Sequence, residues 1–320
     1  MLKKIFLMAL LALFFVFVFS GCAQQDKEAV NISIGTAPAT GSFYPVGVAM
    51  ADVLNNHTEG IEATAEETGG SAENLALIDE GRIEMGFSPG ETIEKAVLGI
   101  EPFTKKTEVL LGWVLFLDPI QPIALKESGI TSIKELEGKR VSIGAPGATV
   151  NFTAIELLEA HGVDTKKVSF TYLGWGEAAD ALADKKIDAA FFQSAIPSPA
   201  IEGLAARMPI QLLEVDSAVL EKDFADKALF PGILPAGSYS GQDEDIIWPL
   251  DYAYCFFSPD LSEDLAYTIT KTVFENINKI GEAHPMGKNM HLITEEVAEN
   301  IGLGVHPGAI KYAKEIGIWE

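Results

Sequence analysis

The stretch ISIGTAPATGSFYPVGVAMADVLNNH, residues 32–57, decides the fold class. It opens with the alternating apolar run ISIG at 32–35, which is typical of a strand. A loop rich in Gly, Pro and hydroxyl side chains follows, and YPVGVAMADVLNNH at 44–57 then has helical spacing. A strand, a glycine-rich loop and a helix in this order indicate an α/β protein.

The same alternation continues along the chain. Apolar runs predict further strands at 61–67, 83–88, 140–145, 168–174, 187–193 and 210–215. Helical patterns are expected from Ser71, over 151–161 and from Gly176. A break near residues 116–122 divides the strands, so we predict two sheets that are mainly parallel.

Two apolar segments cross between the sheets. The first passes through Pro119 and Pro122, before a capping-box helix predicted by Ser132-x-x-Glu135 and the strand from Arg140. The second is DYAYCFFSPD at 251–260, before a helix from about Ser262. Two crossings make the first lobe discontinuous, with lobe 1 expected over 31–116 and 253–320 and lobe 2 over 117–252.

Six loops share one position in this pattern, after a strand and before a helix. They are GTAPATGSFYP, EETGGSAEN, FSPGET, GAPGATVN, LGWGEA and FFQSAIPSP. Ligands bind at this edge of an open parallel sheet, and the N-termini of helices there favour anions. Arg82 and Arg140 precede strands and therefore belong at the opposite edge. Backbone N–H groups and hydroxyls would then hold a carboxylate in a cleft between the lobes.

Each loop also has a simpler interpretation. The first loop has no Lys after Gly41 where a phosphate loop requires one. Ser71-x-x-Asn74 is equally compatible with a helix cap and with ligand contact. Trp175, between Gly174 and Gly176, and Gln193, at the end of an apolar strand, fit either the core or the cleft.

The N-terminus reads as an export signal. Residues 1–21 combine two lysines, an apolar run and small residues, and Ser20-Gly21-Cys22 looks like a bacterial lipobox. We expect cleavage before Cys22, lipidation of that residue, a tether over 22–30 and an extracytoplasmic, membrane-anchored protein. The alternative is an ordinary secreted protein with an incidental Cys22. Only Cys255 remains besides it, so no internal disulfide is expected.

Charge and motifs exclude several classes of function. The formal net charge is −23, and removal of Lys3 and Lys4 with the leader lowers it by two, to −25, which disfavours nucleic acid as a partner. No histidine lies in the six loops, and HExxH, CxxC and GxSxG are absent from the sequence. The acidic run at 241–247 lacks the spacing of a calcium loop. We therefore expect no catalytic residues, no metal and no cofactor.

The order of several blocks resembles the TAXI family, the extracytoplasmic solute receptors of TRAP transporters. The resemblance spans about residues 31–317 and is carried by the blocks TGSFYPVG, EETGGSAENL, IEMGFS, SIKELEGKRVSIGAPG, YLGWGEAADAL, KKIDAAFFQSAIPSPAI, ILPAGSYSGQDEDI, SEDLAYTITKTVFEN and GVHPGAIKYAKEIG. It implies a type II periplasmic-binding-protein-like fold, in which two α/β lobes joined by two crossing strands close around a solute. It also implies a non-enzymatic, monomeric receptor that delivers a small organic anion, such as glutamate or 2-oxoglutarate, to TRAP membrane subunits.

The resemblance and the cleft loops together indicate a set of ligand-binding residues. These are Thr36, Thr40, Ser42, Tyr44, Thr68, Ser71, Asn74, Ser88, Gly147, Thr149, Trp175 and Gln193. The first loop departs from the family pattern at Ala37-Pro38 and Phe43, and the loop of the second lobe departs at Ala148 and Val150. These changes remove hydroxyls and glycines that the family usually has, so the usual ligand does not follow automatically.

Other functions fit part of the same pattern. A lipid-anchored sensing subunit of a signalling membrane protein would have the same cleft chemistry. An ABC-type binding protein would share the fold but not the block order. An exported enzyme would need a nucleophile and base that the loops do not offer.

Overall fold

The computed structural model describes residues 29–224 and 229–320. The predicted signal peptide and Cys22 lie outside these residues. Within them, no helix has both the length and the apolar character that a bilayer span requires.

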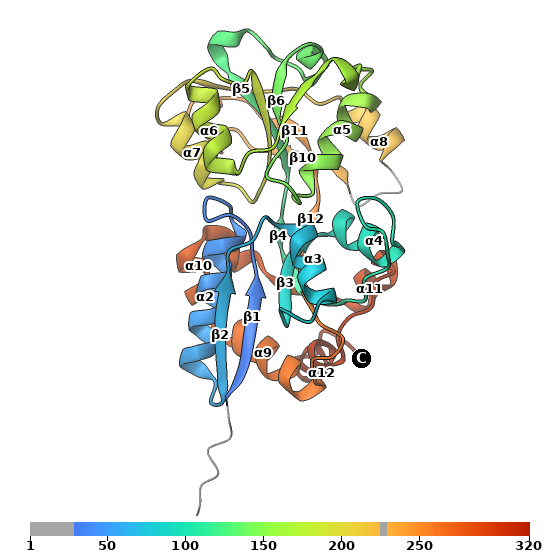
Figure 1. Cartoon of the computed structure of the whole chain (residues 1–320). Coiled ribbons are helices and arrows are strands. Elements are labelled where there is room, and N and C mark those ends of the chain that lie inside the picture. The colour runs from blue at the N-terminus through green and yellow to red at the C-terminus, as the bar shows by residue number, and fades with distance from the viewer. Residues whose placement is uncertain (1–28, 225–228) are drawn as a thin grey trace, which may run out of the picture.

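Lobe 1, the lower part of Figure 1, is built on a six-stranded sheet with the order β13-β4-β12-β3-β1-β2. Its strands are β1 (Val30–Gly35), β2 (Ile61–Glu66), β3 (Met85–Pro89), β4 (Leu110–Leu117), β12 (Tyr252–Phe257) and β13 (His291–Leu292). Its helices are α2 (Phe43–His57), α3 (Ser71–Asp79), α4 (Gly90–Leu98), α9 (Glu263–Glu275), α10 (Ile277–Ala283), α11 (Glu295–Ile301) and α12 (Pro307–Glu315). Two distant stretches of chain therefore build one sheet.

Lobe 2, the upper part of Figure 1, contains a five-stranded sheet with the order β7-β6-β8-β5-β9. Its strands are β5 (Ile120–Leu125), β6 (Arg140–Ser142), β7 (Ser169–Thr171), β8 (Ala189–Gln193) and β9 (Ile210–Leu212). Its helices are α5 (Val150–Ala160), α6 (Trp175–Ala183), α7 (Pro199–Ala205) and α8 (Ser217–Asp223). An antiparallel ribbon, β10 (Phe230–Leu234) and β11 (Ile246–Leu250), completes the lobe.

The α/β fold with two sheets is confirmed, and most strands of each sheet run in one direction, but both sheets also contain antiparallel strands. β1 pairs in parallel with β2 and β3, while β12 is antiparallel to β3 and β4. In lobe 2, β6 is parallel to β7 and β8, while β5 is antiparallel to β8 and β9. β5 and β12 enter their lobes from the hinge, so they run away from the cleft while the strands beside them run toward it.

The other local differences are small. The capping box of Ser132 and Glu135 forms, but it begins a short 3-10 turn over Ile133–Leu136 instead of an α-helix. The acidic run at 241–247 lies at the end of the turn between β10 and β11 and enters β11 at Ile246, and Asp245 accepts a hydrogen bond from Ala236 N at 2.8 Å. Each lobe has its own apolar core, with Trp113 fully buried in lobe 1 and Trp248 fully buried in lobe 2.

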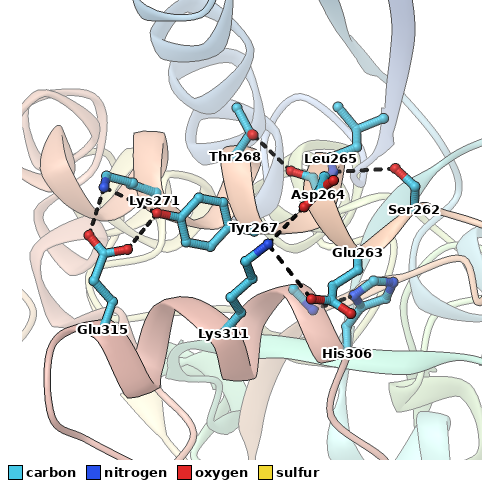
Figure 2. A network of polar contacts seen from close by, with 11 residues as sticks. Ser262, Glu263, Asp264, Leu265, Tyr267, Thr268, Lys271, His306, Lys311 and Glu315 are labelled. Atoms are coloured by element: carbon cyan, nitrogen blue, oxygen red, sulfur yellow. Dashed lines mark hydrogen bonds and ion pairs between the residues drawn. The ribbon is translucent and has the colours of Figure 1, made fainter.

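The C-terminal helix α12 packs closely against α9. Figure 2 shows Lys311 between Glu263 and Asp264, and Lys271 beside Glu315. Exposed ion pairs of this kind each contribute little to stability. Close approach of the backbones is more important, since a Cβ on Gly308 would lie 2.4 Å from Glu263 O. The family block GVHPGAIKYAKEIG thus places a glycine where two helices meet.

Candidate ligand-binding cleft

A cavity of about 30 Å³ lies between the two lobes, enough for about two water molecules. It is lined by Ala37, Pro38, Gly41, Ser42, Phe43, Gly69, Gly70, Ser71, Pro89, Asp118, Ala145, Ala148, Thr149, Trp175, Gln193 and Ser194. These residues come from both lobes and from the crossing between them. Any larger ligand must therefore enter with the lobes further apart.

The starts of four helices line the cavity. Ser42 and Phe43 start α2, Ser71 starts α3, Thr149 precedes α5, and Trp175 starts α6. The N–H groups of a first helical turn have no partner within the helix, and the helix dipole adds partial positive charge there. The cavity therefore offers hydrogen-bond donors to a negatively charged group from both lobes.

Glycines allow the lobes to approach closely at this point. A Cβ on Gly69 would lie 2.9 Å from Pro146 O in the opposite lobe, and Gly70 has a φ of +118°. Ala72 N donates to Gly147 O at 2.9 Å across the cleft. The glycines of the second loop therefore permit direct backbone contact between the lobes.

Side chains of α4 and α5 form a second set of contacts between the lobes. The Oγ1 atoms of Thr92 and Thr149 are 2.5 Å apart, and Thr153 Oγ1 donates to Glu91 Oε2 at 2.8 Å. Lys95 Nζ lies 3.0 Å from a carboxylate oxygen of Glu156. The chain is thus in a closed conformation, with direct bonds between the lobes beside the cavity.

Three buried polar side chains that line the cavity have atoms with no hydrogen-bond partner among residues 29–224 and 229–320. These atoms are Ser42 Oγ, Asp118 Oδ1, and both Nε2 and Oε1 of Gln193. The three residues are 2%, 2% and 6% exposed. A buried polar atom left without a partner costs about 1–3 kcal/mol, so a polar ligand that satisfies these atoms gains this free energy.

The hinge places two buried carboxyl groups next to the cavity. Asp118 follows β4 and Asp251 precedes β12, and Asp118 N donates to Asp251 O at 2.8 Å. Burial raises the pKa of Asp118 to about 8 and raises that of Asp251 well above its ordinary value. Asp251 Oδ2 accepts from Glu91 N at 3.2 Å and its Oδ1 accepts from Tyr252 N at 2.7 Å. Asp118 lines the cavity, and its buried Oδ1 has no hydrogen-bond partner among the described residues.

Part of the predicted ligand-binding set lines the cavity, namely Ser42, Ser71, Thr149, Trp175 and Gln193. Trp175 of lobe 2 lies next to Gly41 of lobe 1, since a Cβ on that glycine would be 3.0 Å from the indole ring. The ring also packs on Phe192 with a centroid distance of 5.8 Å. Trp175 therefore contacts the core of its own lobe and the opposite wall together.

The other predicted residues do not line the cavity: Thr36, Thr40, Tyr44, Thr68, Asn74, Ser88 and Gly147. Asn74 Nδ2 donates to Thr36 O and Phe87 O, at 2.7 and 2.9 Å, and its Oδ1 accepts from Thr68 Oγ1 at 2.7 Å. This network joins the ends of β1 and β3 behind the site. The side chain of Asn74 positions the first two loops, and both N–H donors of its amide are used by backbone carbonyls.

The remaining members of this group have other partners or positions. Ser88 Oγ donates to Pro89 O at 3.0 Å, and Thr40 Oγ1 accepts from Gly176 N at 3.1 Å across the cleft. Tyr44 is half-buried on α2. Thr40 and Gly147 thus contribute to the contact between the lobes.

Asp118 and Ser194 line the cavity, but the sequence interpretation missed them. Asp118 lies between an apolar strand and Pro119 in a segment that the sequence identified only as a crossing. A lone acid in such a segment was the available signal. Among residues 29–224 and 229–320, no group of three or more His, Cys, Asp and Glu side chains is arranged to hold a metal ion.

The sequence matches the NMT1-like family over residues 34–317. The chain belongs to the NMT1-like family. The TAXI resemblance of the sequence blocks is not shown by this match.

This NMT1-like chain was also compared with solved structures. PhnD1 from Prochlorococcus marinus, in complex with methylphosphonate, superposes with a TM-score of 0.55 at 10% identity, covering 90% of this chain and 98% of PhnD1. The alkanesulfonate-binding protein SsuA from Xanthomonas axonopodis pv. citri gives a TM-score of 0.48 at 13% identity, covering 90% and 84%. The likeness to PhnD1 shows that the fold is the two-lobed periplasmic-binding-protein fold with mixed sheets.

Proposed function

We propose that this protein is an extracytoplasmic solute receptor of the TAXI type. It captures a small organic anion, a dicarboxylate or an acidic amino acid, and delivers it to the membrane subunits of a TRAP transporter. The observation that carries the proposal is the cavity itself, where four helix starts from two lobes meet buried polar atoms that have no partner. PhnD1, which has the same fold, binds methylphosphonate, also a small anion.

The geometry supports capture by closure. In an open state the carboxylate of the ligand first meets the helix starts of one lobe. Rotation about the crossings at Asp118 and Asp251 then brings the second lobe onto it and excludes water. The bonds between the lobes form only in the closed state, and the ligand adds differential contacts that shift the population toward it. The closed form would then be the one that the transporter recognises.

No chemical transformation is part of this proposal. Within the described residues, Cys255 is buried and hydrogen-bonds only weakly to Phe256 O, and burial raises its thiol pKa well above the ordinary value. A thiol held in this protonated form is a poor nucleophile. Lipidation at Cys22 would keep the receptor, acting as a monomer, near the membrane subunits.

A thermal-shift screen of dicarboxylates, amino acids and sugar acids on the purified full-length protein tests ligand capture. A ligand at a hundred times its dissociation constant should stabilise the folded state by roughly 2.7 kcal/mol. If no organic anion raised the melting temperature, the proposal of an anion-binding cleft would be rejected. Recovery of the unchanged compound after incubation separates binding from turnover.

Delivery is tested by transport. Vesicles that contain TRAP membrane subunits and carry an inward Na⁺ gradient should accumulate the radiolabelled ligand only when the receptor is added. Uptake that is independent of the receptor would reject the transport role. Ligand binding with no effect on uptake, together with a change in a signalling partner, would favour the sensing alternative.

A further inference from the structure

Among the described residues that line the cavity, Asp118 alone belongs to a type that can carry a charge at neutral pH. It ends the crossing out of lobe 1, its backbone N–H is held by Asp251 O, and its Oδ1 atom has no partner. At 2% exposure it is also out of reach of bulk water. A buried carboxyl of this kind requires either a proton or a donor that comes from outside the protein.

Among the described residues, no side chain that carries a positive charge lines the cavity with Asp118. Arg82, Arg140 and Arg207 pair with Glu80, Asp188 and Asp180 far from the cavity lining. Lys95 pairs with Glu91 and Glu156 at the contact between α4 and α5. The cavity lining contains no lysine, arginine or histidine.

The helix starts and Asp118 favour different groups of one ligand, because the helix starts bind a negative group and Asp118 binds a hydrogen-bond donor. Ala72 N of α3 and Gly176 N of α6 are already bonded across the cleft. The other N–H groups at the starts of α2, α3, α5 and α6, together with Ser42 Oγ, suit a carboxylate. Asp118 Oδ1 suits a donor, best one with positive charge, because charge-assisted bonds are about twice as strong as neutral ones. The amide of Gln193 can donate and accept, so it accommodates either group.

We infer that the ligand is an amino acid whose protonated amino group donates to Asp118 while its carboxylate lies at the helix starts. The inference rests on the proposed receptor function and selects within its ligand class. It makes Asp118 a specificity-determining residue, which discriminates against dicarboxylates and 2-oxo acids that lack a donor.

Matched pairs of compounds test this assignment. Isothermal titration calorimetry on the purified full-length protein would compare each amino acid with its 2-oxo acid, including glutamate with 2-oxoglutarate and alanine with pyruvate. At least one amino acid should bind about tenfold or more tightly than its 2-oxo partner, since losing a bond to a charged group and leaving the carboxyl unpaired costs at least this factor.

The variant Asp118→Asn keeps the shape of the side chain but removes its charge and adds an amide donor. This variant should bind the preferred amino acid about tenfold or more weakly than the wild type does. The ratio of the dissociation constants of the 2-oxo acid and the amino acid should then be close to one. Asp251→Asn is the matched control, because this carboxyl lies behind Asp118, is hydrogen-bonded to backbone N–H groups and does not line the cavity. It should leave the ratio unchanged.

The outcomes separate the two proposals. A 2-oxo acid that binds the wild-type protein as tightly as its amino acid overturns the role of Asp118 and leaves the receptor function standing. If Asp118→Asn still binds the amino acid more tightly than its 2-oxo acid, the role of Asp118 is likewise overturned and the receptor function still stands. If no compound of either kind binds the wild-type protein, the organic-anion receptor itself is rejected, and the inference with it. If a variant does not fold, the ratio of the affinities of amino acid and 2-oxo acid for the wild-type protein decides whether Asp118 selects the ligand.

Discussion

Asp118 should make the stability of the ligand-free protein depend on pH in a direction that is unusual for a carboxyl group. Its folded pKa of about 8 lies above the ordinary value of 3.8 because the side chain is buried. Between these values the folded state holds a proton that the unfolded state has lost. The stabilising contribution is thus fully present below the ordinary value and is lost as the pH rises toward 8.

The magnitude follows from the difference between the two pKa values. About 4 pH units at 1.36 kcal/mol each give roughly 6 kcal/mol in total, of which about 4 kcal/mol is lost between pH 5 and pH 8. Asp118→Asn cannot titrate. The free energy of unfolding of this variant should therefore rise relative to wild type by about this amount over the same range.

Urea unfolding followed by circular dichroism at pH 5, 6.5 and 8 measures this difference. The control is Asp184→Asn, because Asp184 is exposed and its pKa is lowered by the hydrogen bond to Lys186. That variant should show no gain at pH 8. An equal pH dependence in wild type and Asp118→Asn would refute the argument that Asp118 is buried without a compensating partner.

Three further predictions address closure and packing. Saturating ligand should change tryptophan fluorescence, and Trp175→Phe should remove most of this change. The reason is that Trp113 and Trp248 are buried in the cores of the two lobes and do not line the cavity. An unaltered fluorescence response in the variant would reject the placement of Trp175. Thr92→Val removes a 2.5 Å bond between the lobes and should weaken ligand affinity about 2–10-fold by calorimetry, whereas Thr268→Val, whose hydroxyl donates to Asp264 O within α9, should not. Gly308→Ala should lower the free energy of unfolding by about 1–3 kcal/mol, because the added Cβ would meet the backbone of α9. Gly203→Ala in α7 is the control and should be neutral, because a Cβ there would have no other atom within 4 Å. Equal urea midpoints for the two glycine variants would contradict this account of packing.

The sequence predicted most of the strand and helix positions because their signals are local. The run 32–57 covers most of β1, the first loop and α2 in the predicted order, and the pattern around Gly176 anticipates the start of α6 within one residue. The direction of β5 and β12 was not predicted. Strand direction depends on where the chain re-enters a sheet, and no local periodicity records that.

Several loops that line the cavity could be identified for a similar reason. Loops at the carboxyl ends of parallel strands converge, so Ser42, Ser71 and Thr149 line one cavity although they are far apart in the chain. Loop position could not show which polar side chains face the cavity. Asn74 turns inward because backbone carbonyls at the ends of two strands need donors, and Asp118 faces the cavity because the hinge leads the chain past it.

The sequence by itself determined the α/β class, the two lobes with their crossing segments and the glycine-rich loops between strands and helices, because each of these depends on neighbours within a few residues. Tertiary structure alone decided which polar groups were satisfied by the protein and which were left for a ligand. Whether a buried oxygen has a partner depends on atoms brought together from distant parts of the chain. For this reason the loop at 35–47 could be recognised as one wall of a cleft, while the demand that Asp118 places on the ligand became visible only after the lobes were folded and closed.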